Sequence, residues 1–240
     1  MIQRKVKIVC HKGANHKAPE NTLAAACLCV EWGVDYVEID VHTSKDGVFY
    51  IFHGPNLQRT TNGTGWVGSY TSQEIDGLDA GSWFSPEFAG ERVPRLEPFL
   101  DWIKGKARVF LDVKNADPRR LAELVRAAGL EDECFFWSGD PDWMRQLHAI
   151  EPRLALKVNV ETVSDVYAAR EEFDARIVEV SPQNVTPELL AACRRLGIQA
   201  MALYLGNDPA VLRQILHSGV DMINTDDGDV VLAAMSEFTG

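Results

Sequence analysis

Short apolar runs alternate with amphipathic stretches along almost the whole of this chain. The apolar runs read as strands near 6–11, 35–41, 108–114, 134–138, 154–159, 176–181, 199–204 and 221–225. Between them, apolar residues recur at helical spacing, for example over 21–33, 119–128, 187–196 and 209–218. Eight strand–helix units in a chain of this size predict an α/β fold, the TIM (β/α)8 barrel.

Two of the helix starts carry recognisable capping residues. Asn21 or Thr22 is expected to cap the first helix, and Thr186-Pro187 places a cap directly before a proline at the first helical position. Both signals agree with the boundaries that the apolar spacing predicts.

The second strand departs from this rhythm, because another alternating run follows it almost at once. Asp46-Gly47 separates VEIDVHTS from VFYIFH, and Asp-Gly between alternating runs predicts a two-residue hairpin. So short a link excludes a parallel crossover, so the second run should fold back antiparallel. With this turn Thr43 faces Tyr50 and Asp40 faces His53. The sequence therefore predicts a β-hairpin extension after strand two, outside the eight barrel strands.

Composition narrows the class of protein. The chain has 240 residues and no linker, so we expect a single domain over residues 1–240. A hydrophobic content of 46% is ordinary for a globular core, and a net charge of −11 argues against nucleic acid as a partner. We find no signal peptide or membrane span, and five scattered cysteines are typical of reduced thiols, so we expect a cytoplasmic protein. The helices have no apolar seam that would specify an oligomer.

Charged side chains gather at the carboxyl ends of the first three barrel strands, where the active sites of TIM barrels lie. They are His11, Lys12, Glu38, Asp40, Asp112 and Lys114, and the hairpin adds His53. Neighbouring carboxylates on one sheet face are costly unless a cation holds them. Oxygen ligands suit Mg²⁺ or Ca²⁺ better than zinc, so Glu38, Asp40 and Asp112 are candidate metal ligands. The alternative is a buried ion-pair network with the two lysines.

His11 and His53 are the candidate catalytic residues, because histidine acts as acid or base near neutral pH. On opposite sides of a cation they fit phosphodiester cleavage, in which one activates the attacking oxygen and the other protonates the leaving alkoxide. Lys114 shares a face with Asp112 and would neutralise a phosphoryl oxygen. Lys12 would do the same or form a salt bridge at the rim.

The roles of several other polar residues stay open. Lys157 and Glu179 interrupt apolar runs near the ends of strands five and six, so they either contact substrate or form an ion pair with each other. His42 is expected outside the lumen. Asp226 and Asp227, at the end of strand eight, are expected to cap or turn the chain.

Several motifs resemble those of the glycerophosphodiester phosphodiesterase family. They are HKGANHKAPENTLAA, VEIDVHTSKDGVFYIFHGPNLQRTTNGTG, LDAGSWF and GERVPRLEPFL in the first half, then LDVK and GVDMINTD. The resemblance implies a TIM barrel that hydrolyses glycerophosphodiesters to glycerol 3-phosphate and an alcohol with Mg²⁺ or Ca²⁺. The family's paired histidines match His11 and His53, and its metal-binding Glu-x-Asp matches Glu38 and Asp40. Its third carboxylate matches Asp112, and its phosphate-contacting basic residues match Lys12 and Lys114.

Four departures from the family pattern bear on the substrate more than on the reaction. Lys12 replaces an arginine and lacks its planar fork, and Gly54 replaces an acid after the second histidine. Asp112 is one methylene shorter than the usual glutamate, and Tyr204 stands where an aromatic wall is expected. A sugar phosphodiester of the agrocinopine type is therefore an alternative small-molecule substrate. A second alternative is a catalytically silent relative that only binds phosphodiesters.

Overall fold

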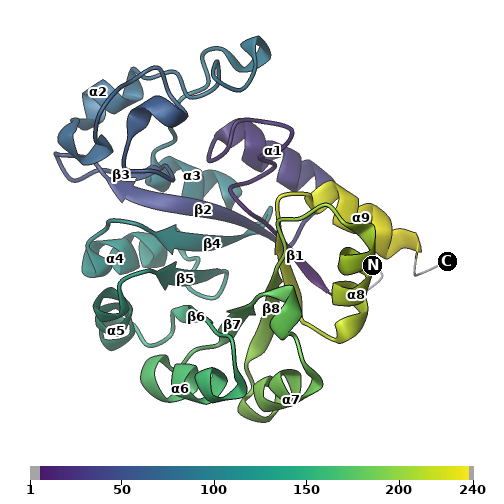
Figure 1. The fold of residues 1–240 in the computed structure, drawn as a ribbon. Helices are drawn as coiled ribbons and strands as arrows, with labels where there is room; N and C mark the ends of the chain where they lie inside the picture. The colour runs from purple at the N-terminus through teal and green to yellow at the C-terminus, as the bar shows by residue number, and fades with distance from the viewer. Residues whose placement is uncertain (1–5, 238–240) are drawn as a thin grey trace.

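Nine strands form one sheet in this computed structural model, which describes residues 6–237 (Figure 1). They are β1 (Lys7–Cys10), β2 (Tyr36–Thr43), β3 (Phe49–Ile51), β4 (Arg108–Val113), β5 (Cys134–Ser138), β6 (Ala155–Asn159), β7 (Ile177–Val180), β8 (Gln199–Leu203) and β9 (Met222–Thr225). β1 pairs in parallel with both β2 and β9, which closes eight parallel strands into a barrel, while β3 pairs antiparallel with β2. The TIM barrel with a hairpin extension after strand two is thus confirmed.

Helices enclose this barrel (Figure 1). They are α1 (Leu23–Trp32), α3 (Leu96–Ile103), α4 (Pro118–Ala128), α5 (Pro141–Ile150), α6 (Val163–Phe173), α7 (Pro187–Leu196), α8 (Pro209–Ser218) and α9 (Gly228–Glu237). Thr22 caps α1 and Thr186 caps α7, each accepting a backbone N–H of the first turn. Over residues 6–237 no helix is long and apolar enough to cross a membrane, and the five cysteines are free thiols.

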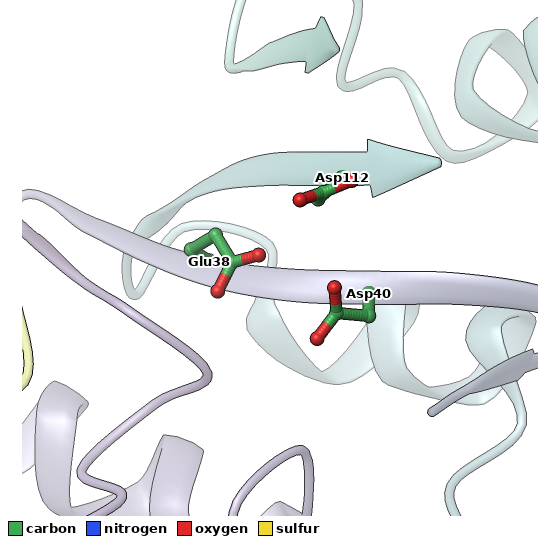
Figure 2. A group of neighbouring side chains, drawn as sticks. All are labelled: Glu38, Asp40 and Asp112. Atoms are coloured by element: carbon green, nitrogen blue, oxygen red, sulfur yellow. The ribbon is translucent and has the colours of Figure 1, made fainter. Parts of the chain in front are cut away.

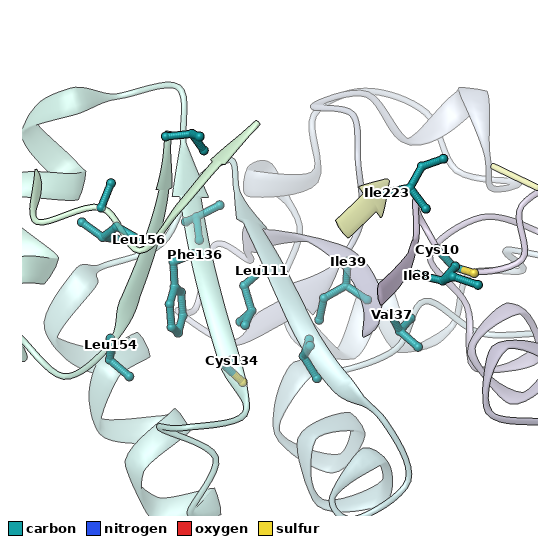
Figure 3. Close-up of a cluster of buried hydrophobic side chains, with 14 of the residues drawn as sticks. Ile8, Cys10, Val37, Ile39, Leu111, Cys134, Phe136, Leu154, Leu156 and Ile223 are labelled. Atoms are coloured by element: carbon teal, nitrogen blue, oxygen red, sulfur yellow. The ribbon is translucent and has the colours of Figure 1, made fainter. Parts of the chain in front are cut away.

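Alternation along the strands separates two apolar layers. Outward side chains pack beneath the helices, as Figure 3 shows for Ile8, Val37, Ile39, Leu111 and Phe136. Inward side chains fill the barrel interior: Val9, Tyr36, Phe110, Phe135, Ile177, Met201 and Met222. On several strands the residue two positions later, on the same face, is polar: Glu38 after Tyr36, Asp112 after Phe110, Glu179 after Ile177 and Asn224 after Met222. An apolar plug therefore underlies a polar layer nearer the carboxyl ends of the strands.

The hairpin register differs from the predicted one by one residue. Residues 41–43 of β2 pair with 51–49 of β3, so Thr43 faces Phe49 instead of Tyr50. The carbonyl of Asp40 accepts the N–H of Phe52, so Asp40 does not face His53. The two-residue turn was therefore a wrong prediction.

Ser44 explains the longer turn. Its Oγ accepts the N–H of Val48 at 2.9 Å and donates to Asp46 at 2.7 Å. Gly47 ends the turn at φ +85°, a conformation that favours glycine. A side chain that pairs with the backbone inside the loop thus adds residues to the connection, which a pattern of apolar positions does not reveal.

The segment between β3 and α3 forms a small lobe beside the hairpin (Figure 1). It contains α2 (Ser72–Asp76) and the short 3₁₀ helices η1 (Leu57–Arg59), η2 (Val67–Ser69) and η3 (Pro86–Phe88); a fourth, η4 (Pro182–Asn184), follows β7. Its own apolar cluster consists of Tyr50, Phe52, Leu57, Val67, Ile75, Ala80 and Val93. His53 belongs to this lobe, near its junction with β3.

Candidate active site

Three carboxylates, which we call the acidic cluster, lie together at adjacent strands (Figure 2). Glu38 and Asp40 come from β2 and Asp112 from β4, where Asp40 and Asp112 are register partners. One ligand oxygen from each lies within 4.8 Å of the others, and Glu38 and Asp40 are each only 1% exposed. The structure thus brings the three predicted metal ligands together.

The acidic cluster carries more negative charge than its surroundings neutralise. Burial, and then the charges of Asp40 and Asp112, raises the pKa of Glu38 well above its usual value. Burial and the charge of Asp40 raise the pKa of Asp112 to about 6. Lys114 Nζ lies 2.6 Å from Asp112 and 3.0 Å from Asp40, and these carboxylates raise the pKa of Lys114 against the lowering effect of burial. One ammonium among three carboxylates leaves an excess that a cation would offset.

The donor set fits a hard divalent cation. Carboxylate oxygens are the ligands that Mg²⁺ and Ca²⁺ prefer. Within the described residues, Oδ1 of Asp112 is buried and has no hydrogen-bond partner, so it is free to bind a ligand. The backbone N–H of Lys12 donates to Oε2 of Glu38 at 2.5 Å, which orients that carboxylate from outside the cluster.

Asn21 orients Asp40, a role that the sequence did not indicate. Its amide nitrogen donates to Asp40 Oδ2 at 2.7 Å, and its amide oxygen accepts the N–H of Asp40 at 3.0 Å. Asn21 is buried and has φ +58°, a backbone conformation that asparagine tolerates. Of the two possible helix caps, Thr22 performs the capping, so Asn21 serves the acidic cluster instead.

His11 follows β1 and is held by Asp226. Nδ1 of His11 lies 2.8 Å from Oδ1 of Asp226, and the Asn15 amide donates to the same oxygen. Although burial opposes the effect, these hydrogen bonds lower the pKa of Asp226, which is therefore ionised at neutral pH. Asp226, which we expected to cap or turn the chain, thus also holds His11. The two residues are 215 positions apart and meet because β9 closes the barrel on β1.

His53 lies two residues beyond β3 and has a different set of partners. Its Nδ1 is 3.2 Å from Nη2 of Arg59, and Arg59 is bound to Glu20 through both terminal nitrogens at 3.0 and 2.5 Å. The carbonyl of His53 accepts from Nε2 of His42 at 3.2 Å. The ring and the backbone of His53 are thus held separately.

Burial, and to a smaller extent nearby charges, favours the neutral ring of His53. Burial lowers the pKa of His53, and the charges of Lys12 and Lys114 lower it further against the opposing charge of Asp40. These same groups belong to the predicted site, so His53 and the acidic cluster lie within one electrostatic environment.

His42 faces the site, contrary to our expectation. It follows Asp40 by two residues on β2, so strand alternation places both on the same face. His42 is 7% exposed and lines a pocket of about 340 Å³ with His53, Trp66 and Lys114. Burial lowers the pKa of His42, which is therefore a neutral polar group at the mouth.

The first turn after β1 contributes through its backbone. Lys12 has φ +57° and Gly13 φ +77°. A Cβ on Gly13 would lie 2.8 Å from Cβ of Ala25, so the turn needs glycine to pack against α1. The Lys12 Nζ lies 4.0 Å from Glu20, a rim salt bridge that matches one of its two predicted roles.

Lys157 and Glu179 form the ion pair that was one of their two predicted roles. Nζ of Lys157 lies 2.6 Å from Oε2 of Glu179, and the Asn224 amide donates to Oε1 at 2.9 Å. Lys157 also donates to Asn159 at 2.8 Å. Tyr204 lines a separate cavity of about 430 Å³ between the β8–α8 loop and α9, and its hydroxyl bonds the backbone of Asp208. Substrate contact by these three residues stays a prediction.

Solved structures and curated proteins of similar sequence are known. A crystal structure of a glycerophosphodiester phosphodiesterase from Agrobacterium tumefaciens str. C58 is 41% identical, with a TM-score of 0.91 over 95% of this chain and 99% of that one. An Oleispira antarctica phosphodiesterase in complex with the product sn-glycerol-3-phosphate is 25% identical, with a TM-score of 0.86 over 96% of each chain. A glycerophosphodiester phosphodiesterase of Caldanaerobacter subterraneus subsp. tengcongensis is 28% identical over 95% of this chain and 97% of that protein.

Fold, site and these likenesses together define a phosphoric diester hydrolase built on a TIM barrel. The sequence profile of the glycerophosphoryl diester phosphodiesterase family matches residues 11–230, which is most of the chain, and the chain belongs to that family. The resemblance of its motifs is thereby confirmed.

Proposed function

We propose that this protein is a metal-dependent phosphodiesterase that hydrolyses a glycerophosphodiester to glycerol 3-phosphate and an alcohol. One observation supports the proposal most strongly. The acidic cluster is contacted by the turn that carries His11, through the Lys12 N–H to Glu38, and the charge of Asp40 acts on His53. The relative that binds sn-glycerol-3-phosphate supports the choice of substrate. We also propose that the whole chain acts as a single domain on a small molecule in the cytoplasm.

Glu38, Asp40 and Asp112 would hold the cation, Mg²⁺ or Ca²⁺. When bound, a divalent cation supplies Lewis-acid stabilisation of negative charge on the phosphoryl group. Asn21 and the Lys12 N–H keep two of the carboxylates oriented for this task.

His11 and His53 would form the general acid/base pair. One takes the proton of the attacking oxygen, and the other supplies a proton to the leaving alkoxide. Lys114 would contact a phosphoryl oxygen, since an ammonium beside the acidic cluster stabilises charge that develops in the transition state. Lys12, whose ammonium lies beside Glu20 at the rim, would contact a second phosphoryl oxygen. Lys157, Glu179 and Tyr204 would contact the remainder of the substrate from the far side of the barrel mouth.

A sugar phosphodiester is the second candidate substrate, and the pocket beside His53 favours it. Trp66 lines this pocket and is 61% exposed, next to His42 and Lys114. An exposed tryptophan face presents a large amphipathic surface, on which the ring of a sugar would pack.

The test is turnover over a panel of diesters: glycerophosphocholine, glycerophosphoethanolamine and a sugar phosphodiester, each with Mg²⁺, Ca²⁺ or EDTA. His11→Ala and His53→Ala should each abolish cleavage, while His148→Ala, on the outer helix α5, serves as the matched control and should not. The best diester would identify the substrate. If no diester is cleaved while metal still binds, the enzyme proposal fails and a silent phosphodiester binder is favoured.

A further inference from the structure

The two site histidines have chemically opposite partners at the same ring atom. Nδ1 of His11 is 2.8 Å from a carboxylate oxygen of Asp226, and Nδ1 of His53 is 3.2 Å from a guanidinium nitrogen of Arg59. A neutral imidazole has one N–H and one lone pair, so the partner of Nδ1 decides what Nε2 offers.

For His53 the assignment follows from the donor inventory. A guanidinium has five N–H donors and no acceptor, so Nδ1 of His53 must accept from Arg59. The proton of the neutral ring is then on Nε2. For His11 the ionised carboxylate of Asp226 can only accept, so in the neutral form of the ring Nδ1 carries the proton and Nε2 carries the lone pair.

Arg59 is itself held in place. Nη1 and Nη2 donate to the two oxygens of Glu20 at 3.0 and 2.5 Å, which leaves the second hydrogen of Nη2 for His53. The side chain of Glu20 is only 12% exposed and also lies 4.0 Å from Nζ of Lys12. Arg59 closes η1, whose Leu57 is fully buried and bound through its N–H to the carbonyl of Gly65. A planar fork anchored in this way keeps its direction.

We propose that Arg59, anchored by Glu20, is a positioning residue that fixes His53 in the Nε2–H tautomer, so that in the free enzyme only His11 offers a lone pair at Nε2. His53 then presents a hydrogen-bond donor, and the first proton of the reaction goes to His11. The catalytic consequence rests on the proposed function, whereas the tautomers are properties of the free protein.

Nuclear magnetic resonance of the histidine side chains tests the tautomers directly. Long-range ¹H–¹⁵N correlations would be recorded on the metal-free full chain at about pH 8, where unperturbed imidazoles are neutral. His11→Ala and His53→Ala assign the signals. We expect the Nε2–H pattern for His53 and the Nδ1–H pattern for His11. The Nδ1–H pattern at His53 would overturn the proposal.

Arg59→Met tests whether the guanidinium is the cause. It should bring the two ¹⁵N shifts of His53 closer together as the second tautomer becomes populated, and Arg59→Lys should restore part of the original pattern. Arg95→Met is the matched control, since Arg95 also forms a two-point ion pair, with Asp76, and is similarly exposed. It should leave the His53 shifts unchanged. Unchanged His53 shifts in Arg59→Met would contradict the role of Arg59.

Kinetics extend the test. Arg59→Met should lower kcat about tenfold with KM within about twofold, because orientation of His53 is lost and substrate binding is not. Loss of binding alone, seen as a raised KM at constant kcat, would contradict a positioning role. If the tautomers are as proposed but no diester is cleaved, the positioning by Arg59 stands and the proposed function fails.

Discussion

The barrel interior contains two buried groups of charged residues, the Lys157–Glu179 pair and the acidic cluster. The charges of the pair balance, and those of the acidic cluster do not. Lys157 and Glu179 compensate each other at 2.6 Å, and the Asn224 amide donates to the second oxygen of Glu179. The Lys157 ammonium also lies 4.5 Å from the ring centre of Trp137, a favourable cation–π contact. This lysine–glutamate pair is complete without a ligand.

The acidic cluster lacks such compensation. Lys114 is shared between Asp40 and Asp112, while Glu38, among the residues that the structure describes, accepts a backbone N–H from Lys12 and forms no ion pair. Burial, and then the charges of neighbouring carboxylates, raises the pKa values of Glu38 and Asp112. The same barrel balances its buried charge on β6 and β7 and leaves it unbalanced on β2 and β4. We therefore propose that the imbalance serves ligand binding rather than folding.

The largest expected effect is on catalysis. Glu38→Gln keeps the shape of the side chain and an acceptor for the Lys12 N–H but removes one charge from the acidic cluster. Activity on the best diester should fall about 10³-fold or more, because each 1.36 kcal/mol of lost transition-state stabilisation is a factor of ten. Activity close to that of the wild type, with saturating Mg²⁺, would mean that the acidic cluster is not catalytic.

The next largest effect is expected on the free energy of unfolding, when the Lys157–Glu179 pair is broken. Lys157→Met leaves the charge of Glu179 buried and unpaired, and breaking such a pair typically costs about 3–5 kcal/mol. The double variant Lys157→Met/Glu179→Gln should recover most of that loss, because neither charge remains. Urea denaturation of both variants measures the difference. Equal destabilisation by the single and double variants would show that charge balance is not what this pair provides.

The stability of the folded protein should depend on pH through the acidic cluster. The folded-state pKa of Asp112, about 6, lies above its ordinary value near 3.8, so its contribution to stability is present at low pH and is lost as pH rises through about 4 to 6. In EDTA the free energy of unfolding should therefore fall over this range, by at most about 3 kcal/mol from Asp112 alone, and the thermal midpoint should fall with it. Ca²⁺ should reverse the fall at pH 7 and have little effect at pH 4, where protons occupy the carboxylates. A midpoint independent of Ca²⁺ at pH 7 would contradict the cation site.

The smallest effect is expected on Ca²⁺ affinity, when the Lys157–Glu179 pair is replaced. Lys157→Met/Glu179→Gln leaves the net charge of the interior unchanged, so Ca²⁺ affinity should stay within about threefold of the wild type. Calorimetry measures this affinity. A loss of a hundredfold would mean that the two polar groups form one site, and the contrast between them would disappear.

The strands, helices and strand-end residues could be predicted because they depend on local periodicity. Successive side chains of a strand alternate between its two faces, which predicted that Glu38 and Asp40 share one face. The succession of apolar runs predicted that Asp112 lies at the end of the next barrel strand. We predicted the wrong face for His42 because we misapplied this rule, which places His42 on the same face as Asp40.

The supporting contacts could not be predicted, because they depend on how loops run after the barrel closes. Asp226 reaches His11 only across the β1–β9 closure, and Asn21 reaches Asp40 from a loop with positive φ. The hairpin register depends on a single hydroxyl, Ser44, that bonds the backbone within the turn. No periodic pattern encodes any of these contacts.

We propose that the acidic cluster, whose charge is not compensated, is a divalent-cation site. The most direct test is calorimetric titration of Ca²⁺ or Mg²⁺ into the metal-free wild type and Glu38→Gln at pH 7.5, with circular dichroism to establish that both are folded. We predict one ion bound per wild-type chain and at least a hundredfold weaker binding to Glu38→Gln, about 2.7 kcal/mol. Equal affinity for the two folded proteins, or no binding to the wild type, would contradict the claim.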